Sequence, residues 1–364
     1  MKNSKRLLIA GGGTGGHVLA GIAVADLWKQ SGLGEVFFAG AQGGIEEKLV
    51  PRAGYSLELL KLGSLNRVGI KRKIQTLFQL PFAFIKSVLI LKKIRPYAVF
   101  GVGGYASGPI LLTAKLLSWL KVIDARVAIL EQNSVPGMTN RILGKFVDQI
   151  FSAFPGTEPY FNSDHVLVTG NPVRSDLMPM SPAPRLPFTV FIFGGSQGAL
   201  GINTLVLEAL PFLADLKGKI FFIHQTGEKD FIRVNEAYDK GGTKAVVEKF
   251  IYNMKSAYSE ASLLVCRAGS STLAEIAAVG RASVLVPFPY ASNNHQEKNA
   301  QIFVDTGAAI LIPQFKSKGE DLARVIRECM SNPYKIEKME KAVAAFYKPD
   351  AAKEIVLELQ KSGH

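Results

Sequence analysis

The sequence has little cysteine, no long apolar run and few acidic residues, and each shortage removes a class of protein. Its two cysteines, Cys266 and Cys329, lie far apart without the spacing of metal ligands, so we expect no disulfide framework and a reducing compartment. No run of about 18 apolar residues occurs, which argues against a membrane-spanning helix. Only residues 7–10 are apolar ahead of the first glycines, too few for the core of a signal peptide.

The deficit of acidic residues leaves a basic chain. Lys and Arg number 43 against 30 Asp and Glu, a formal net charge of +13, so we expect an anionic partner such as nucleic acid, an acidic membrane face or a phosphorylated substrate. Aromatic residues are not interleaved with arginines as in single-strand binders, so nucleic acid ranks last and we predict no nucleic-acid partner. At 364 residues and 48% hydrophobic composition, the chain is long enough for two globular domains.

What the sequence has in abundance is glycine, gathered in three loops. Each follows an apolar run, and the loops read GGGTGGH at residues 11–17, GVGGY at residues 101–105 and GGSQGA at residues 194–199. A strand, a glycine loop and a helix present backbone N–H groups and a positive helix end to a ligand, an arrangement that favours phosphate or nucleotide. Three such loops predict a cleft that binds anionic groups on both sides.

Short apolar runs alternate with helical segments along both halves of the chain. This alternation is typical of doubly wound parallel sheets, in which ligands bind outside the carboxyl ends of the strands. We therefore predict an α/β protein of two Rossmann-like domains facing each other across a cleft. The expected domains are residues 1–172 and 173–347, with a proline-rich joint at residues 178–187 and a final helix, residues 348–364, that packs back on the first domain.

Residues 69–96 are unusually apolar and carry lysines and arginines at both ends. One interpretation is a pair of buried helices with solvated ends. The other is a patch that rests on a membrane, with apolar side chains in the acyl boundary and the cations on acidic headgroups. A helix can bury one face and show another to lipid, so the two interpretations are compatible.

The motifs together identify a family. GGTGGH at residues 12–17, GVGGY at 101–105, EQN at 131–133, GNPVR at 170–174 and GGSQGA at 194–199 occur in the family's order, followed by RAG at 267–269, Glu275, Gln296 and Asn299. This set resembles the MurG family, bacterial transferases that add N-acetylglucosamine from UDP-N-acetylglucosamine to the undecaprenyl-diphospho-muramoylpentapeptide lipid. The resemblance spans nearly the whole chain.

The resemblance implies an inverting hexosyltransferase of the GT-B fold that converts lipid I to lipid II in peptidoglycan synthesis. It also implies a peripheral protein on the cytoplasmic face of the cell membrane, with roles in cell-wall biogenesis, cell shape and cell division. The first domain would bind the lipid acceptor and the anionic membrane surface, and the second would bind the UDP-sugar donor.

His17 is the candidate general base. An inverting transfer needs a group that takes the proton from the attacking sugar hydroxyl, and a helix N-terminus disfavours imidazolium, which leaves the ring able to accept. The alternative is that His17 only hydrogen-bonds the acceptor or the diphosphate. The resemblance places His17, Gly103, Gly104, Tyr105 and Asn133 on the acceptor side, and the alternative for Tyr105 and Asn133 is a packing or loop role.

The resemblance also implies a set of donor-binding residues. In it, Ser196 and neighbouring amides hold the UDP diphosphate, Ile251 recognises uracil through backbone groups, and Glu275 accepts from the ribose hydroxyls. Two alternatives stay open. Glu275 fits the capping-box spacing of the TLAE stretch at residues 272–275, and Arg174 suits an interdomain structural role as well as a cationic one. The full set comprises Thr14, Gly15, Gly16, Asn133, Arg174, Ser196, Gln197, Ile251, Glu275 and Gln296.

Two departures and one absence qualify the resemblance. The family usually has His where this chain has Leu130, and Gly-Leu-Arg where it has Ser64, Leu65 and Asn66, so no role is carried over to those positions. The chain contains no Asp-x-Asp, the usual metal–diphosphate ligand of the other large glycosyltransferase fold. Leaving-group charge would then fall to amide dipoles and cations, so we predict no metal and no cofactor.

Three other functions compete with this interpretation. A related GT-B transferase would move another sugar to a lipid or small aglycone. A nicotinamide oxidoreductase would need Gly-x-Gly-x-x-Gly and an acidic end to the second strand, and residues 36–41 read VFFAGA. A catalytically dead nucleotide-sugar sensor is disfavoured by the presence of His17, Asn133 and Glu275, although Leu130 leaves it some room.

Overall fold

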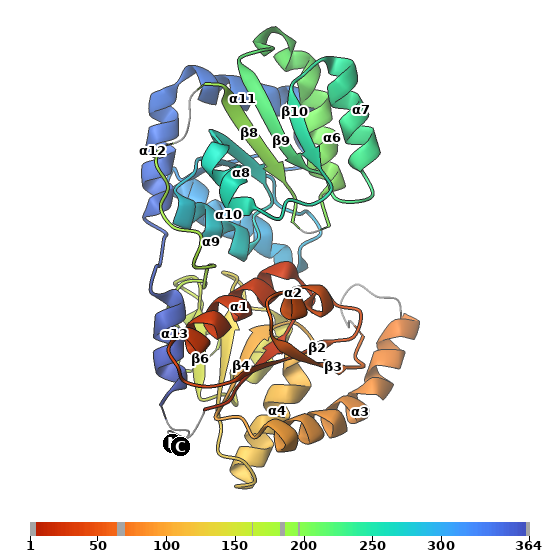
Figure 1. The fold of residues 1–364 in the computed structure, drawn as a ribbon, viewed down its shortest axis with the longest axis vertical. Helices are drawn as coiled ribbons and strands as arrows, with labels where there is room; N and C mark the ends of the chain where they lie inside the picture. The colour runs from red at the N-terminus through yellow and green to blue at the C-terminus, as the bar shows by residue number, and fades with distance from the viewer. Residues whose placement is uncertain (1–4, 64–69, 162, 183–185, 196, 362–364) are drawn as a thin grey trace. The chain divides into compact units, whose positions relative to one another are not determined.

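The computed structural model describes residues 5–63, 70–161, 163–182, 186–195 and 197–361, without the side chains of residues 70–77. The chain divides into two compact units. Unit 1 comprises Met1–Arg174 and Lys348–His364, and unit 2 comprises Ser175–Tyr347. Each unit has its own parallel sheet (Figure 1).

Unit 1 is built on a seven-stranded parallel sheet in the order β3-β2-β1-β4-β5-β6-β7. Because β1 pairs with both β2 and β4, the loops that follow these strands meet at one edge of the sheet. The strands are β1 (Leu7–Gly11), β2 (Val36–Ala41), β3 (Ser56–Leu60), β4 (Ala98–Gly103), β5 (Arg126–Glu131), β6 (Gln149–Ser152) and β7 (Val166–Val168).

Alternate residues of the central strand enter two different cores. Leu7 and Ile9 pack with helix α1 (Gly15–Gln30) and helix α13 (Ala351–Leu359) on one face. Leu8 and Ala10 pack on the other face with helix α3 (Ile70–Ile94) and helix α4 (Ser107–Trp119). Helices α2 (Glu46–Arg52) and α5 (Met138–Leu143) and the short η1 (Glu158–Tyr160) complete the unit. Both faces of the sheet are covered, which explains the near-continuous apolar strands.

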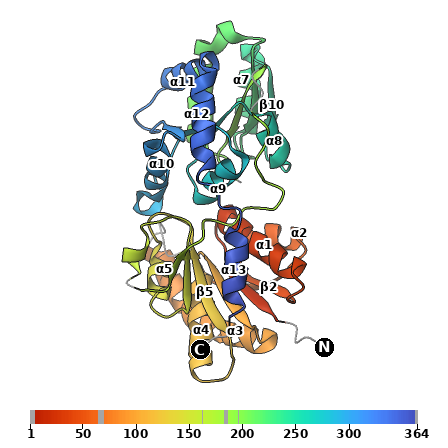
Figure 2. The ribbon, with the colours of Figure 1, turned by 90° about the vertical axis from the view of Figure 1, so that its left-hand side faces the viewer.

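The C-terminal helix belongs to unit 1 although it follows unit 2 in the chain (Figure 2). Ile355, Val356 and Leu359 are buried in the same core as α1. Arg126 of β5 pairs with Glu358 at 3.5 Å, and both side chains are largely buried.

The expected pair of helices within residues 69–96 is wrong. The segment forms one helix, α3, of 25 residues with Pro81 inside it. Its buried side chains recur at helical spacing through Ala83, Ser87, Ile90 and Ile94, and this face packs against α4 (Figure 1). Packing of this face, which begins two residues after Pro81, therefore helps to offset the hydrogen bond that a proline removes. Among the described helices, none combines the length and apolar character needed to cross a bilayer.

Unit 2 is built on a six-stranded parallel sheet in the order β10-β9-β8-β11-β12-β13. Its strands are β8 (Phe188–Phe193), β9 (Ile220–Gln225), β10 (Ala245–Glu248), β11 (Leu263–Cys266), β12 (Ser283–Leu285) and β13 (Ala309–Leu311). Its helices are α6 (Leu200–Ala209), α7 (Phe231–Gly241), α8 (Met254–Glu260), α9 (Ser270–Val279), α10 (His295–Asp305), α11 (Gly319–Ser331) and α12 (Pro333–Ala344), with the short η2 (Leu210–Leu216) and η3 (Ser292–Asn294). The prediction of two Rossmann-like domains is confirmed.

Candidate functional site

The first two glycine loops interlock at the carboxyl edge of the unit 1 sheet. The amide of Gly12 donates to the carbonyl of Gly103 at 3.1 Å. A Cβ atom on Gly104 would lie 2.4 Å from the carbonyl oxygen of Gly12, and one on Gly11 would lie 2.3 Å from that of Gly103. Because Gly104 also has φ +87°, only glycine allows this approach.

His17 lies in the first turn of α1, directly behind these loops. Thr14 caps the helix, and its side chain accepts the amide of His17. The ring Nδ1 lies 2.9 Å from the carbonyl oxygen of Gly12. Because a carbonyl can only accept, Nδ1 carries a proton, and in the neutral ring Nε2 is then the acceptor. Nε2 faces the second loop, where a Cβ atom on Gly103 would lie 3.0 Å from it.

Asn133 is held beside these loops by a buried carboxylate. Glu131, at the end of β5, accepts from the amide and the side-chain nitrogen of Asn133 at 2.8 and 3.2 Å. It also accepts from the amide of Gly137 and from Asn140. Burial raises the pKa of Glu131 above its usual value, and these hydrogen bonds offset only part of that rise. The sequence places Glu131 within a motif but gives it no role, whereas the structure shows that it orients Asn133.

The strand order brings the acceptor-side residues together. β1, β4 and β5 are neighbours, so the loops that carry His17, Tyr105 and Asn133 share one edge. Gln132 links two of them by donating to the carbonyl of Gly16 at 3.4 Å. Leu130 is fully buried in the core, which accounts for an apolar residue there, and Ser64, Leu65 and Asn66 lie outside the described residues.

Glu46 is a residue that sequence reasoning missed. This carboxylate is 1% exposed and accepts the amides of Gly13 and Ala41. The amide of Gly13 is therefore bound within the protein, which removes one group from the phosphate-binding role expected for the first loop. Its partners lie 33 and 5 residues away, and no local spacing signals the longer contact.

The third glycine loop, after β8, packs against the end of β9. A Cβ atom on Gly198 would lie 2.0 Å from the carbonyl oxygen of Thr226, and Gly198 has φ +73°. Gln225 donates to the carbonyl of Gly195 and accepts the amide of Ile251, both at 2.9 Å. This buried side chain, also missed from the sequence, joins the loop to the segment expected to meet uracil. Ser196 lies outside the described residues.

Glu275 is half-buried in α9 and accepts a hydrogen bond from the hydroxyl of Tyr258 at 2.9 Å. The capping-box alternative is wrong, because α9 begins at Ser270 with Gly269 as its N-cap. Thr272 therefore lies inside the helix rather than at its start. The carboxylate is positioned by a neighbouring side chain instead of by its own helix end.

Arg267 and Gln296 fix the loops after β11 and β12. The guanidinium of Arg267 donates to the carbonyls of Val286 and Pro287 and to Gln314 Oε1, at 2.9, 3.0 and 2.7 Å. Burial lowers the pKa of Arg267 to about 10. Gln296, in the first turn of α10, accepts the amide of Phe288 at 2.9 Å. The expected donor residues Gln197, Ile251, Glu275 and Gln296 thus all follow strands at the carboxyl edge of the unit 2 sheet.

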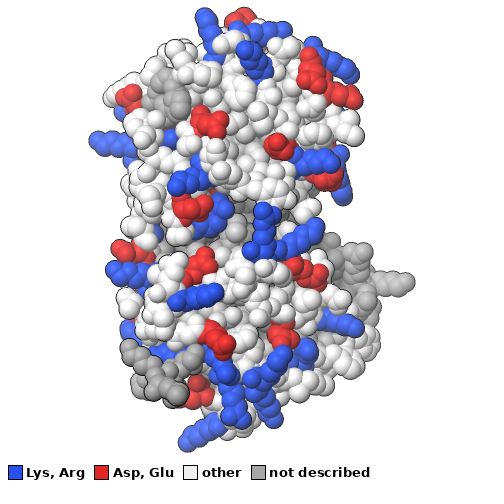
Figure 3. Space-filling view, viewed as in Figure 1, with Lys and Arg blue, Asp and Glu red and all other residues white. Residues whose placement is uncertain are grey.

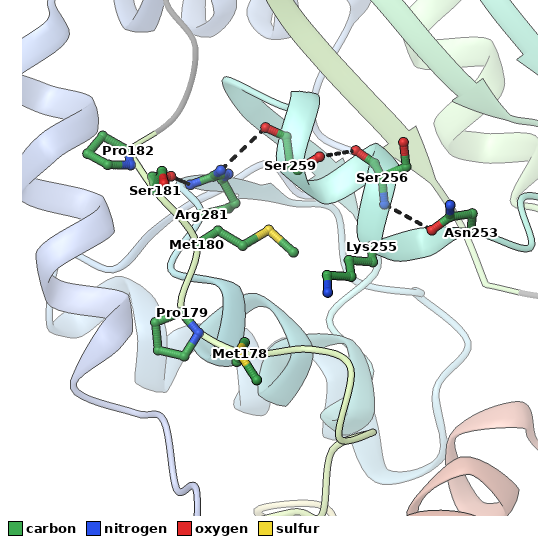
Figure 4. Close-up of a pocket in the computed structure, with 10 residues that line it drawn as sticks. All are labelled: Met178, Pro179, Met180, Ser181, Pro182, Asn253, Lys255, Ser256, Ser259 and Arg281. Carbon is green, nitrogen blue, oxygen red and sulfur yellow. Dashed lines mark hydrogen bonds between the residues drawn. The ribbon is translucent and has the colours of Figure 1, made fainter.

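A cavity of about 670 Å³ lies elsewhere in unit 2, between residues 178–182 and α8 (Figure 4). Arg281 forms its wall and donates to the carbonyls of Ser181 and Tyr258 at 2.8 and 3.0 Å. The guanidinium is engaged in holding residue 181 to α8. None of the expected donor residues that the structure describes lines the cavity. Among the described residues, no group of three His, Cys, Asp or Glu side chains is placed to hold a metal ion.

Comparison with known proteins places the chain. The glycosyltransferase family 28 N-terminal domain matches residues 7–152, and the family 28 C-terminal domain matches residues 189–355. A Myxococcus xanthus protein named UDP-N-acetylglucosamine–N-acetylmuramyl-(pentapeptide) pyrophosphoryl-undecaprenol N-acetylglucosamine transferase is 45% identical over 96% of this chain and 91% of its own length. A Citrifermentans bemidjiense protein of the same name is 43% identical over 96% of this chain and 98% of its own.

Solved structures agree with these sequence relatives. The crystal structure of Acinetobacter baumannii MurG has a TM-score of 0.74 and 30% identity, and the match covers 98% of this chain and 99% of that one. A kitacinnamycin glycosyltransferase matches at a TM-score of 0.70 and 14% identity over 98% and 100% of the two chains, which shows the shared fold. The chain therefore belongs to glycosyltransferase family 28, within the MurG group of N-acetylglucosaminyltransferases.

Proposed function

We propose that this chain transfers N-acetylglucosamine from UDP-N-acetylglucosamine to undecaprenyl-diphospho-N-acetylmuramoyl-pentapeptide, with inversion, in peptidoglycan synthesis. The observation that carries this proposal is the 41–45% identity over 96% of the chain with relatives named for that reaction. The activity is that of a UDP-N-acetylglucosamine-dependent hexosyltransferase. The rest of the mechanism is argued from the residues at the two sheet edges.

In the proposed mechanism His17 is the general base. Its Nε2 accepts the proton of the attacking sugar hydroxyl while that oxygen bonds to the anomeric carbon and the bond to the UDP oxygen breaks. The supporting observation is that Nδ1 donates to the carbonyl of Gly12, so the lone pair of a neutral ring is on Nε2. Gly103, Gly104, Tyr105 and Asn133 border this nitrogen in the proposal and bind the acceptor.

The donor is proposed to bind mainly through unit 2. Glu275 accepts from the ribose hydroxyls, Ile251 meets the uracil, and Ser196, Gln197 and Gln296 bind the diphosphate and sugar. Thr14, Gly15, Gly16, Asn133 and Arg174 complete the proposed donor set. The amides of Gly15 and Gly16 suit this role because the first N–H groups of a helix have no acceptor within it.

Unit 1 is proposed to rest on an anionic membrane surface through α3 and α4. Phe78, Phe82, Ile85 and Leu89 recur at helical spacing along α3 and are 58–73% exposed. Trp119, at the end of α4, is 78% exposed, and α4 packs beside α3. A row of exposed apolar side chains on one helix is typical of an interfacial contact.

Basic side chains accompany this apolar row. Lys86, Lys92 and Lys93 of α3 are exposed, as is Lys121 after α4. Basic side chains also gather at the lower end of the face in Figure 3, on unit 1. Cations beside apolar side chains favour acidic headgroups. We propose peripheral attachment to the cytoplasmic face of the cell membrane, next to a lipid-linked acceptor.

The test of the reaction is radiolabelled UDP-N-acetylglucosamine incubated with the undecaprenyl-linked acceptor. Label should move into the lipid fraction, and the product should carry the opposite anomeric configuration to the donor. Transfer from a different nucleotide sugar, with none from this one, would favour a related GT-B transferase instead. UDP binding without any turnover would contradict the enzymatic role.

A further inference from the structure

Glu46 is a buried carboxylate that has no role in the reaction proposed above. It is 1% exposed and begins α2. Its Oε2 accepts the amide of Gly13 at 3.0 Å and its Oε1 accepts the amide of Ala41 at 2.9 Å. One carboxylate therefore ties the loop after β1 to the end of β2.

Three glycines make room for this side chain. A Cβ atom on Gly12 would lie 2.1 Å from Glu46 Oε1, one on Gly44 would lie 2.3 Å from Oε2, and one on Gly40 would lie 2.5 Å from Cγ. Gly12 belongs to the first loop, Gly40 to strand β2, and Gly44 to the turn before α2. Burying a carboxylate costs free energy that an apolar side chain would not, so its presence in so close a fit calls for a role beyond filling space.

The same peptide group that Glu46 holds also holds His17. The N–H of the Gly12–Gly13 peptide donates to Glu46, and the C=O of that peptide lies 2.9 Å from His17 Nδ1. A trans peptide points its N–H and C=O in opposite directions, so the carboxylate and the imidazole lie at its two ends. The result is a series of hydrogen bonds that runs from Glu46 through one peptide group to the candidate base.

A carboxylate acting on the N–H makes the C=O a better acceptor. Hydrogen bonds in series polarise one another, and a bond to a charged group is stronger than a neutral one. The carbonyl of Gly12 should therefore hold the Nδ1 proton more firmly, with the ring in one orientation. A base oriented by a third group through hydrogen bonds is a recurrent arrangement in catalysis.

We propose that Glu46 is the positioning residue for His17, acting through the Gly12–Gly13 peptide to keep the proton on Nδ1 and the acceptor lone pair on Nε2. The inference rests on His17 as the base of the proposed reaction. It assigns the first glycine loop to the alignment of the base rather than to the binding of a phosphate by Gly13.

The kinetic test compares E46Q with the matched control E47Q. Glu47 is the next residue of α2, is exposed and accepts the amide of Gly43 at 2.8 Å. E46Q removes the charge and turns an NH₂ group toward a backbone donor, so kcat should fall at least about tenfold while KM for UDP-N-acetylglucosamine changes less than about twofold. E47Q should leave both values within about twofold of wild type.

The second measurement reports on His17 without turnover. Ring ¹⁵N NMR of the substrate-free, histidine-labelled protein, with H17A for assignment, should show Nδ1 protonated in wild type and in E47Q. E46Q should raise the share of the Nε2-protonated form. An E46Q protein that loses turnover while the His17 tautomer stays unchanged would overturn the proposal. An E46Q protein with wild-type turnover and a wild-type tautomer would overturn it as well.

A third variant covers a failure of E46Q to fold. E46D keeps the charge on a shorter side chain, so it should retain part of the Nδ1 preference and lose less turnover than E46Q. Equal loss in E46D with a wild-type tautomer would also overturn the proposal. If the wild-type protein transfers no sugar, the proposed function fails, and the tautomer measurement still decides the role of Glu46.

Discussion

Among single residues, the proposed reaction assigns proton transfer to a ring nitrogen of His17 in unit 1 and donor binding to the carboxylate of Glu275 in unit 2. His17 has one ring nitrogen engaged by a backbone carbonyl and the other directed at the second glycine loop. Glu275 is fixed by the hydroxyl of Tyr258. These different surroundings predict different kinetic effects when each is removed.

For H17A we expect a fall in kcat of about 10²–10⁴-fold, the usual contribution of a general base. UDP affinity should stay near the wild-type value, because the proposed donor contacts of unit 2 are intact. Steady-state rates with labelled donor and calorimetric titration with UDP measure the two effects. H165A, which alters an exposed histidine, is the control. Near-wild-type turnover in H17A would rule out the base assignment.

For E275A we expect the reverse, a larger effect on donor binding than on kcat. Hydrogen bonds to a charged group are worth about 1.5–3 kcal/mol, so KM for the donor should rise about 10–100-fold with a smaller change in kcat. Y258F keeps the ring, which packs edge-on against Phe191 and Phe193, and removes only the hydroxyl that orients Glu275. Its KM should rise less than that of E275A. An E275A variant with unchanged KM would remove Glu275 from the donor site.

The sequence predicts most of the strands and loops at the carboxyl edges of the two sheets. It predicts few of the side-chain contacts that hold those loops in place. Apolar runs that break into glycines locate the loops because strand and turn preferences are local. Glu46 and Gln225 could not be found this way, because they bind backbone amides or carbonyls brought close only by the sheet order. The spacing at Thr272 suggested a helix start, but α9 already begins at Ser270.

At the level of elements, α3 has one buried face and one exposed apolar face. The buried face packs on α4, and the row from Phe78 to Leu89 remains exposed. Pro81 suggests a break from sequence alone, yet one helix continues through it, and the part beyond the proline has a buried face from Ala83 to Ile94 that packs on α4. Local propensity is a weak guide where tertiary contacts are this extensive.

We expect the variant F78S/F82S to bind anionic vesicles at least about tenfold more weakly, because a buried Phe side chain contributes about 1.5–3 kcal/mol. Turnover on a soluble acceptor analogue should stay unchanged. The control is I232S, since Ile232 of unit 2 is 71% exposed and Phe82 is 72% exposed. Co-sedimentation with vesicles measures binding, and equal binding by all three proteins would contradict the proposed membrane contact.

For the whole molecule, a histidine buried in unit 2 predicts a loss of stability in acid. His224 lies between the hydroxyl of Tyr238 and Asn203 Oδ1, each 3.1 Å from a ring nitrogen. Burial lowers the pKa of His224 to about 3. The unfolded chain binds a proton there near pH 6.5, so between these values it holds more protons than the folded chain.

Stability should therefore fall as the pH drops from 7 toward 3, by up to about 1.4 kcal/mol per pH unit from this group. The variant H224Q lacks the titrating ring, so its thermal midpoint should drop less between pH 7 and pH 5 than that of wild type, even from a lower starting value. H165Q is the control. An unchanged pH dependence in H224Q, measured by calorimetry, would contradict this source of acid sensitivity.

The placement of α13 has a consequence for synthesis on the ribosome. The nascent chain makes all seven strands of unit 1 first, but α13, which packs in one core with Ile9 and Val24, is translated only after the whole of unit 2. Until α13 is made, the part of that core that it buries lacks its covering helix. A protein truncated before Ala351 would therefore keep both glycine-rich sheet edges but lack the helix that completes this core of unit 1.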